Sequence, residues 1–403
     1  PYAPFLENTT LRILPKHLWE NVDNEAFPFS SYNFDPIGSG PFKIANITRD
    51  NGGIPKSYSL VPFENYALGE PYLASLKLSF FGSMEALEEA YLSGDIESVN
   101  GIAPERVSVF TRSDAQILST PLPRIFGVFF NQDQATLLAD KTVRTALDLS
   151  APREAVVQNA LGGYGEAITT AAPSYVSIKP TAVDTSSPEE RILEARTLLE
   201  NSGWTWSEEE QALVKEKKDR AGKVTERSVL TFSIATGNVP ELRRTAEILK
   251  DVWGRVGARV EVQVFETGDL NQNVIRPRKY DALLFGMVVG RDLDLFAFWH
   301  SSQPNDPGLD VALYANSTAD KLLAEARTLS NYHERLERYQ AFSEEVREDI
   351  PAVFLYAPEF IYVLPSRING VRFDHATIPS ERFLSVERWY TETESVWNIF
   401  AER

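Results

Sequence analysis

The stretch YDALLFGMVVGRDLDLFAFWHSSQ, residues 280–303, decides the fold class. Its first part, 282–289, is apolar almost without interruption, which is typical of a strand covered on both faces, as in a mostly parallel sheet. Gly286 leaves backbone uncovered there, which suits either a bulge or the close approach of another chain or a ligand. Charged and aromatic residues follow at 290–299, where α/β folds bind their ligands. An ordinary core strand followed by a polar turn is the alternative.

Composition places the chain among ordinary globular proteins. It has 403 residues, 43% of them hydrophobic and 24% charged, enough for two or three domains with sizeable cores. The net charge of −17 argues against nucleic acid as a partner and mildly favours cationic or zwitterionic ligands. The lack of cysteine excludes disulfides, thiolate metal sites and cysteine nucleophiles. No apolar run approaches the roughly 20 residues that span a bilayer.

Local patterns alternate strands with helices, which predicts an α/β fold. Three strands between 41 and 82 precede a helix at 84–93 that ends at Gly94. The clearest helix carries an apolar face from Leu242 to Val256, and Gly257 supplies its stop. The remaining expectations are a buried strand at 124–131, a helix begun by Pro152, a loop at 162–187, a helix at 189–201, a hairpin across 211–235, a strand at 260–264, a short helix at 269–276, a helix opened by a capping box of Ser317 and Asp320, a helix at 331–349, a strand at 354–364 and a mostly helical tail with Trp389, Tyr390 and Trp397.

The residues carry no enzyme signature. The histidines at 17, 300, 333 and 375 include no i, i+4 pair, and neither a nucleophile elbow nor a Walker motif occurs. The glycines at 38 and 40 lead into a strand-like segment, which favours a turn over a phosphate loop. His300 beside Trp299 is interpreted as a hydrogen-bonded packing residue. We therefore expect a protein that is not an enzyme and has neither cofactor nor metal.

Several stretches together resemble the extracellular solute-binding proteins of peptide ABC importers, the oligopeptide- and dipeptide-binding family (solute-binding family 5). They occur in the family's order and are LPKHLWE (14–20), PIGSGPFKI (36–44), FGVFFN (126–131) with DKTVRTALDLSAPREAVV (140–157), YDALLFG (280–286) with FWHSSQ (298–303), and IPAVFLY (350–356). The first lies well inside full-length members. The resemblance therefore implies that the chain, which begins at Pro1 without a signal-like segment, lacks the beginning of the family fold.

The resemblance implies a two-lobed α/β fold of the periplasmic-binding-protein type (type II), N-terminally incomplete, with two crossover strands. The crossings fall near 125–131 and 352–362. Residues 1–124 would form a partial lobe I, 125–364 would form lobe II with a crossover strand at each end, and 365–403 would return to lobe I. We also expect exposed apolar surface on the lobe that contains 36–124.

In the family, an extended ligand lies against the strand equivalent to 283–289, and an Asp in the pattern Gly-Trp-x-x-Asp holds its amino group. Here Met287 and Gly290 replace that Trp and Asp, so Asp292, with Asp294 second, is the expected amine partner. The candidate ligand-binding residues are Phe130, Asn131, Gly286, Met287, Val288, Val289, Gly290, Asp292, Asp294, Trp299 and Tyr356.

The expected function is an extracytoplasmic, monomeric substrate-binding protein that captures peptides or similar extended solutes by strand addition in an interlobe cleft. Its second partner would be an ABC transporter permease, and the missing N-terminal part is a candidate membrane tether. Two alternatives remain: a non-peptide solute such as a nickel chelate or an oligosaccharide, and a carboxylate-dependent hydrolase that uses Asp292, Asp294 or Glu266.

Overall fold

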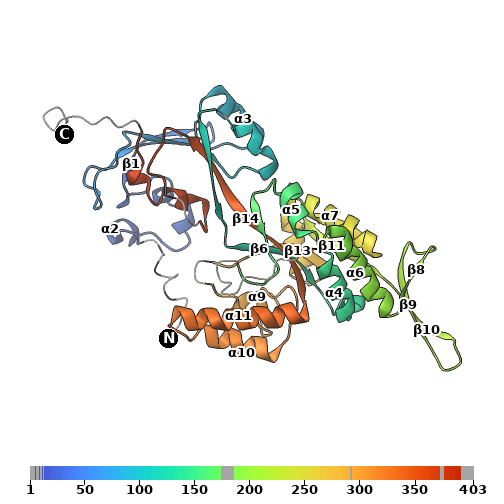
Figure 1. Cartoon of the computed structure of the whole chain (residues 1–403). Helices are drawn as coiled ribbons and strands as arrows, with labels where there is room; N and C mark the ends of the chain where they lie inside the picture. Colours follow the sequence, from blue (N-terminus) through green and yellow to red (C-terminus); the bar gives the residue numbers. More distant parts are fainter. Residues whose placement is uncertain are drawn as a thin grey trace. The chain divides into compact units, whose positions relative to one another are not determined.

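The computed structural model describes residues 5, 9, 11, 13–111, 113–173, 186–290, 293–372 and 376–391 (Figure 1). The chain divides into two units. Unit 1 consists of Pro1–Thr9 and Pro121–Glu359, and unit 2 of Thr10–Thr120 and Phe360–Arg403. The chain passes between them where β5 (Ala115–Pro121) leads to β6 (Arg124–Phe130), and again within β14 (Ala352–Pro365). For the whole protein, the division into lobes at 124 and 364 stays a prediction.

The main sheet of unit 1 is mixed. In the order β12 (Arg259–Phe265), β11 (Thr231–Gly237), β13 (Ala282–Val288), β6 and β14, the first three strands are parallel, whereas β6 is antiparallel to both of its neighbours. The prediction of a mostly parallel sheet was therefore wrong beyond β13. The chain enters and leaves unit 1 through β6 and β14, so no helical crossover forces these strands to run parallel.

Two groups of helices lie beside the strands of this sheet (Figure 1), and each covers an apolar core on one face. The first core is closed by α4 (Lys141–Leu149), α5 (Arg153–Ala160), α6 (Pro188–Asn201) and α7 (Pro240–Val256), the second by α9 (Phe296–Trp299), α10 (Ser317–Ala326) and α11 (Tyr332–Asp349). Ala282 and Leu284 point into the first core and Leu283 into the second, all with no exposed surface. The predicted strand covered on both faces is thus confirmed for the first half of β13.

Helix α7 matches its sequence pattern closely. Its predicted apolar face, from Leu242 to Val256, is buried, and Gly257 ends it with a left-handed φ of 118°. Trp253 is fully buried and donates its indole N–H to the carbonyl of Leu147 at 3.0 Å. This hydrogen bond ties α7 to α4 and satisfies a polar group that burial would otherwise penalise.

Several local expectations differ from the structure. The predicted hairpin is β9 (Ala212–Lys218) and β10 (Val224–Val229), but Ala235 belongs to β11, and β8 (Trp204–Ser207) was missed. The loop at 162–187 contains β7 (Gly165–Ala167), and the helix expected at 269–276 is a short α8 (Thr267–Asp269) continued by a π-helix, η6 (Leu270–Ile275). Asn316, and not Ser317, caps α10, because its side chain accepts from two backbone N–H groups.

Unit 2 contains the predicted three-stranded sheet of β1 (Phe42–Arg49), β2 (Pro55–Pro62) and β3 (Leu76–Ser79). Helix α3 (Met84–Ser93) follows and ends at Gly94, whose φ is 85°, as predicted. The tail was expected to be mostly helical; its described part contains two short 3-10 helices, and Trp397 lies outside the described residues. The other short elements of unit 2 are α2 (Lys16–Trp19), η1 (Phe27–Phe29), η2 (Ser31–Asn33), β4 (Val99–Asn100), η3 (Pro104–Phe110), η7 (Pro379–Phe383) and η8 (Val386–Arg388), whereas η4 (Thr136–Ala139) belongs to unit 1.

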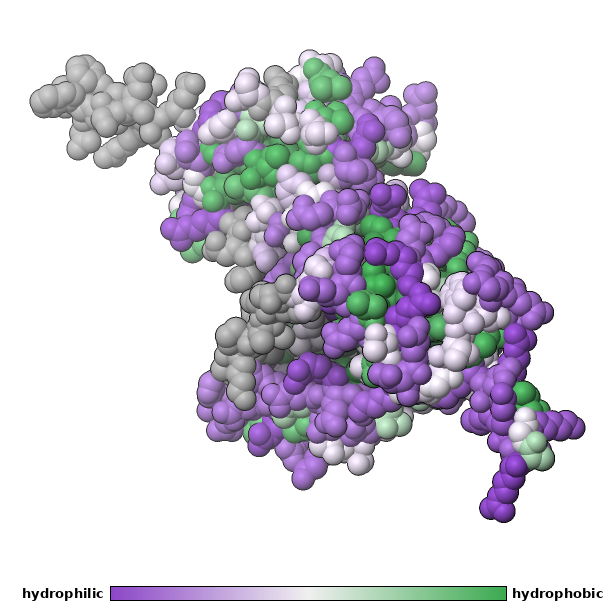
Figure 2. All heavy atoms as spheres, turned by 45° about the vertical axis from the view of Figure 1, so that its right-hand side comes forward, coloured by the Kyte–Doolittle hydropathy of each residue, from purple (hydrophilic) through white to green (hydrophobic). Residues whose placement is uncertain are grey.

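Apolar side chains are exposed on unit 2, as expected for the segment 36–124. They are Ile37, Ile54, Leu68, Tyr72, Phe80, Phe81 and Leu92. Figure 2 shows such green patches on an otherwise mostly purple surface. In the described part of the chain, no helix is both long and apolar enough to cross a membrane.

Candidate functional site

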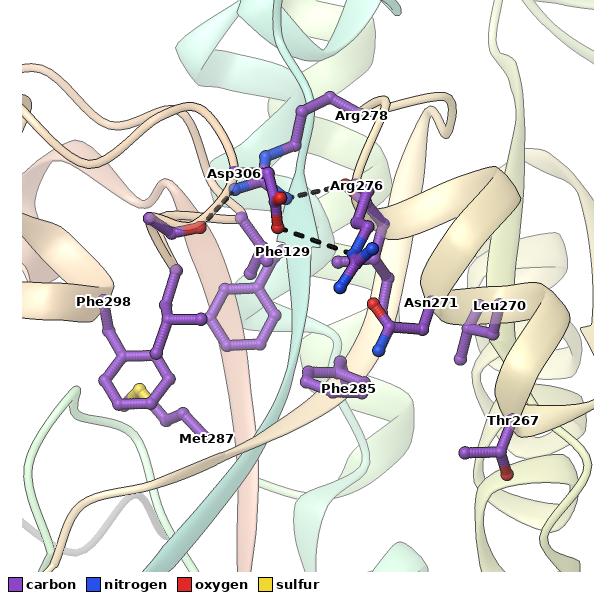
Figure 3. Close-up of a pocket in the computed structure, with 14 residues that line it drawn as sticks. Phe129, Thr267, Leu270, Asn271, Arg276, Arg278, Phe285, Met287, Phe298 and Asp306 are labelled. Atoms are coloured by element: carbon purple, nitrogen blue, oxygen red, sulfur yellow. Dashed lines mark hydrogen bonds and ion pairs between the residues drawn. The ribbon is translucent and has the colours of Figure 1, made fainter. Parts of the chain in front are cut away.

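A cavity of about 220 Å³ opens in unit 1 beside the carboxyl-terminal half of β13 (Figure 3). The residues that line it come from β6, β13, the segment from α8 through η6 to Arg278, α9 and the loop around 304–311. They are Phe129, Thr267, Leu270, Asn271, Ile275, Arg276, Arg278, Phe285, Met287, Phe298, Asp306, Gly308, Leu309 and Val311. Ligand pockets usually measure about 300–1,000 Å³, so this cavity suits one group of a larger ligand.

The cavity has an apolar side and a charged side. Phe285 and Met287, which alternate along β13, contribute to the apolar side together with Phe129 and Phe298 (Figure 3). Arg276, Arg278 and Asp306 lie together at the other side. The cavity can therefore hold a group that is apolar at one end and charged at the other.

Strand β13 has a partner on both sides only in its first half. Ala282 to Leu284 pair with β11 and also with β6, so the expectation of a free edge was wrong for Leu283 and Leu284. From Phe285 to Val288, the described residues provide a strand partner on the β6 side alone. Because β11 ends at Gly237, the second half of β13 keeps one backbone edge without a strand partner, next to the cavity.

A neighbouring side chain leaves no room for a residue larger than glycine at position 286. A Cβ atom placed there would lie 2.6 Å from the ring of Phe126 on β6, which in turn stacks on Tyr356 with ring centroids 5.0 Å apart. The pairing of β13 with β6 keeps a continuous register through this position, which excludes a bulge in that ladder. The group that approaches this glycine is the side chain of Phe126 on the neighbouring strand, so the predicted approach of another chain or a ligand stays a prediction.

Of the two aspartates expected to bind a ligand amine, Asp294 already has partners within the chain. Asp294 forms an ion pair with Arg327, with Oδ2 and Nε 3.2 Å apart, and its Oδ1 accepts the backbone N–H of Phe296 at 3.2 Å. This carboxylate therefore fixes the start of α9. Asp292 lies outside the described residues, so its assignment stays a prediction. Gly290, at the position of the family's Asp, has a φ of 75°, which favours glycine.

Several other candidates are buried in the cores. Phe130, Val289, Trp299 and Tyr356 expose 4% or less of their surface. Burial raises the pKa of Tyr356 well above its usual value, so its hydroxyl stays protonated. Asn131 donates to the carbonyl of Arg278 at 2.8 Å and accepts the N–H of Gln134 at 3.0 Å, which is a structural role.

Among the predicted residues, Met287 lines the cavity, and Val288 is 50% exposed beside it. His300 stacks on Phe296 and its Nδ1 lies 2.8 Å from the hydroxyl oxygen of Ser302, so the interpretation as a hydrogen-bonded packing residue is confirmed. Sequence reasoning missed the three charged residues on one side of the cavity, Arg276, Arg278 and Asp306, which together form its charged wall. Its only signal was the cluster Arg276, Pro277, Arg278 and Lys279 immediately before the strand.

Arg278 holds the charged wall in place. Its guanidinium donates to the carbonyls of Ile275, Pro304 and Gly308 at 2.6, 3.0 and 3.0 Å, which joins the two segments on either side of the cavity. Arg276 instead keeps a half-exposed side chain, and its Nε lies 3.5 Å from Oδ1 of Asp306 (Figure 3). One arginine is therefore structural and the other is available to solvent.

Asp310 is a fully buried carboxylate between two cavity-lining residues. Ala312 donates its N–H to Oδ1 at 3.1 Å, whereas Oδ2 finds no hydrogen-bond partner among the described residues. Burial raises the pKa of Asp310 to about 7, against the opposing effect of nearby backbone N–H groups and the charge of Arg278. Within the described residues, no group of acidic or histidine side chains is arranged to hold a metal ion.

The family "Bacterial extracellular solute-binding proteins, family 5 Middle" matches residues 1–326. The chain belongs to this family. Among curated relatives, the oligopeptide-binding protein AppA of Bacillus subtilis is 26% identical over 392 residues, covering 96% of this chain and 68% of AppA. The dipeptide-binding protein of Escherichia coli is 20% identical over 371 residues, covering 88% of this chain and 62% of that protein. The chain thus spans about two thirds of these relatives.

Solved structures show the same fold. The structure of AppA from Bacillus subtilis in complex with a nonapeptide has a TM-score of 0.67 at 25% identity, over 97% of this chain and 75% of AppA. NikZ from Campylobacter jejuni in complex with Ni(L-His) has a TM-score of 0.68 at 24% identity, over the same shares of the two chains. The resemblance found in the sequence is therefore confirmed, as is the two-lobed solute-binding fold.

Proposed function

We propose that this chain captures peptides, or similar extended solutes, outside the cytoplasm and presents them to the permease of an ABC transporter. One observation carries the proposal: the edge of β13 from Phe285 to Val288 has no strand partner on one side among the described residues, and it borders an apolar cavity. Relatives of the same family are named as oligopeptide- and dipeptide-binding proteins, which supports peptides as the solute class.

Strand addition explains how such a site would bind. An extended ligand placed along Phe285 to Val288 would form backbone hydrogen bonds, each contributing about 0.5–1.5 kcal/mol. Alternate ligand side chains would then point to the face on which Phe285 and Met287 line the cavity. Backbone pairing carries no side-chain information, so the site would accept many sequences and discriminate only at the cavity.

The remaining expectations belong to the same proposal. A monomeric chain would work outside the cytoplasm with two lobes joined by the segments around β6 and β14, would bind its solute without transforming it, and would be tethered to the membrane or free. The predicted contribution of Asp292 to binding a ligand amine is also part of this proposal. Native mass spectrometry of the purified protein would identify a co-purified solute.

A nickel chelate is the second candidate solute. The neighbouring structure of NikZ holds Ni(L-His), and this neighbour is about as similar in fold as the peptide-bound AppA. A binding assay with Ni(L-His) beside a peptide library would decide between the two classes. Release of cleaved product from the library would instead favour the hydrolase alternative.

Peptides N-methylated at single backbone amides test strand addition directly, because each methyl group removes one donor with little change in charge. We expect a loss of roughly 2- to 10-fold in affinity at alternate positions and little change between them. Unmethylated peptide of the same sequence is the reference. Equal affinity for every methylated peptide would contradict strand addition and leave Phe285 to Val288 as ordinary core.

A further inference from the structure

Among the described residues that line the cavity, Arg276 is the charged side chain with the most donors to offer a ligand. In the described part of the chain it makes a single ion pair, through Nε to Asp306 at 3.5 Å, and both side chains are about half exposed, at 56% and 55%. Exposed pairs of this kind contribute little to stability, so a ligand can displace Asp306 at small cost. The two terminal nitrogens of Arg276 would then remain for a planar, two-oxygen partner.

The surrounding charges favour an anion over a cation at this position. Arg278 adds a second positive charge, although its own donors are bound to three backbone carbonyls. Asp306 supplies one negative charge, and Asp310 is buried beside Arg278. When Asp310 holds its proton, the charged wall of the cavity carries a net positive charge, in a chain whose total charge is −17.

The opposite side of the cavity determines which chemical group of the ligand must lie next to its anionic group. Phe285, Met287 and Phe298 form an apolar surface there, and the volume of about 220 Å³ suits one large side chain (Figure 3). A group that joins an apolar side chain to a carboxylate within a few bonds fits both sides at once. The carboxyl-terminal residue of a peptide has this composition whenever its side chain is apolar.

We propose that the cavity binds the carboxyl-terminal end of a peptide, with the carboxylate on Arg276 and the last, apolar side chain on Phe285, Met287 and Phe298. This inference rests on the proposed peptide-binding function and adds the end of the ligand that is recognised. The inference concerns a contact between Arg276 and the ligand carboxylate. The sequence-based prediction concerned a different contact, between Asp292 and the ligand amine. The body of the peptide would extend along the unpartnered edge of β13.

The test compares two forms of one probe peptide, Ala-Ala-Phe with a free amino group, which carries either a free carboxylate or a carboxyl-terminal amide. Isothermal titration calorimetry on the full chain should give an affinity about tenfold to a hundredfold higher for the acid, because amidation removes a charge-assisted contact. Arg276→Gln should lower the affinity for the acid to that for the amide. Asp306→Asn should raise the affinity for the acid, by up to about fivefold, because it frees Arg276.

A matched pair of controls lies elsewhere in unit 1. Arg255 and Glu189 are also half or more exposed and form an ion pair at the same separation, 3.5 Å. Arg255→Gln and Glu189→Gln should leave the affinities for both forms unchanged. If the wild-type chain binds neither form, the result contradicts both the proposed peptide binding and this inference. If it binds both forms equally, or if Arg276→Gln and Arg255→Gln weaken the acid equally, only the inference is overturned.

Discussion

Replacing Asp310 by Asn should make the protein more stable at alkaline pH. The wild-type carboxylate is fully buried, and one of its oxygens has no hydrogen-bond partner among the described residues. Burial raises its pKa from the usual 3.8 to about 7. The folded protein therefore keeps a proton at Asp310 that the unfolded chain releases between these two pH values.

The sign and size of the effect follow from this difference in proton binding. Because the unfolded chain binds fewer protons, stability falls as the pH rises from about 4 to 7, and the full cost is present above pH 7. At about 1.36 kcal/mol per pKa unit, a rise of this size corresponds to roughly 4 kcal/mol. Asn resembles the protonated Asp in shape and charge, so Asp310→Asn removes this cost, which is near zero at about pH 3 and already roughly 1.6 kcal/mol at pH 5.

Scanning calorimetry at pH 5 and pH 8 checks the prediction through the transition that reports on unit 1. The gap between Asp310→Asn and wild type should be roughly 1.6 kcal/mol at pH 5 and rise to roughly 4 kcal/mol in favour of the variant at pH 8. Asp251→Asn is the control, because Asp251 is an exposed carboxylate on α7, and it should show no such change. A gap for Asp310→Asn that is the same at both pH values would refute the reasoning.

Two other substitutions test the packing. Gly286→Ala should destabilise unit 1 by about 1–3 kcal/mol in thermal unfolding, because its Cβ would lie 2.6 Å from the Phe126 ring, whereas Gly254→Ala, with open space at its Cβ, should be neutral or stabilising. Changing both Ile54 and Leu68, which are 65% and 73% exposed, to Ser should lower the fluorescence of a bound hydrophobic dye without lowering the melting temperature; an unchanged signal would place the dye-binding surface elsewhere.

Elements with a strong local pattern could be predicted from the sequence. The apolar face and the glycine stop of α7 depend on contacts at helical spacing and on one left-handed residue, and both are readable along the chain. The same holds for α3 with Gly94. Strand β11 was merged into a hairpin because its neighbours, β12 and β13, are distant in sequence, and local pattern carries no information about such pairing.

The site was predicted less well, for a comparable reason. The position of Asp294 after a buried strand made it a candidate, but only the folded structure shows that its carboxylate forms an ion pair with Arg327. Trp299 is close in sequence to the expected site and Tyr356 lies on an expected crossover strand, yet packing against distant segments buries both. Asp306 and Arg276 are separated by thirty positions and meet only because Arg278 brings the loop that contains Pro304 against η6.

The two arginines before β13 divide the work of the charged wall between them. The guanidinium of Arg278 donates hydrogen bonds to backbone carbonyls at both sides of the cavity, so the charged wall is formed before a ligand binds. A preformed wall avoids the cost of ordering a loop during binding, which leaves more of the interaction energy as affinity. Arg276 is paired in the described residues with half-exposed Asp306, and in the proposed complex it would exchange that partner for the ligand carboxylate while Arg278 keeps the loop in place. The cavity can therefore recognise charge through Arg276 while its shape stays set by Arg278.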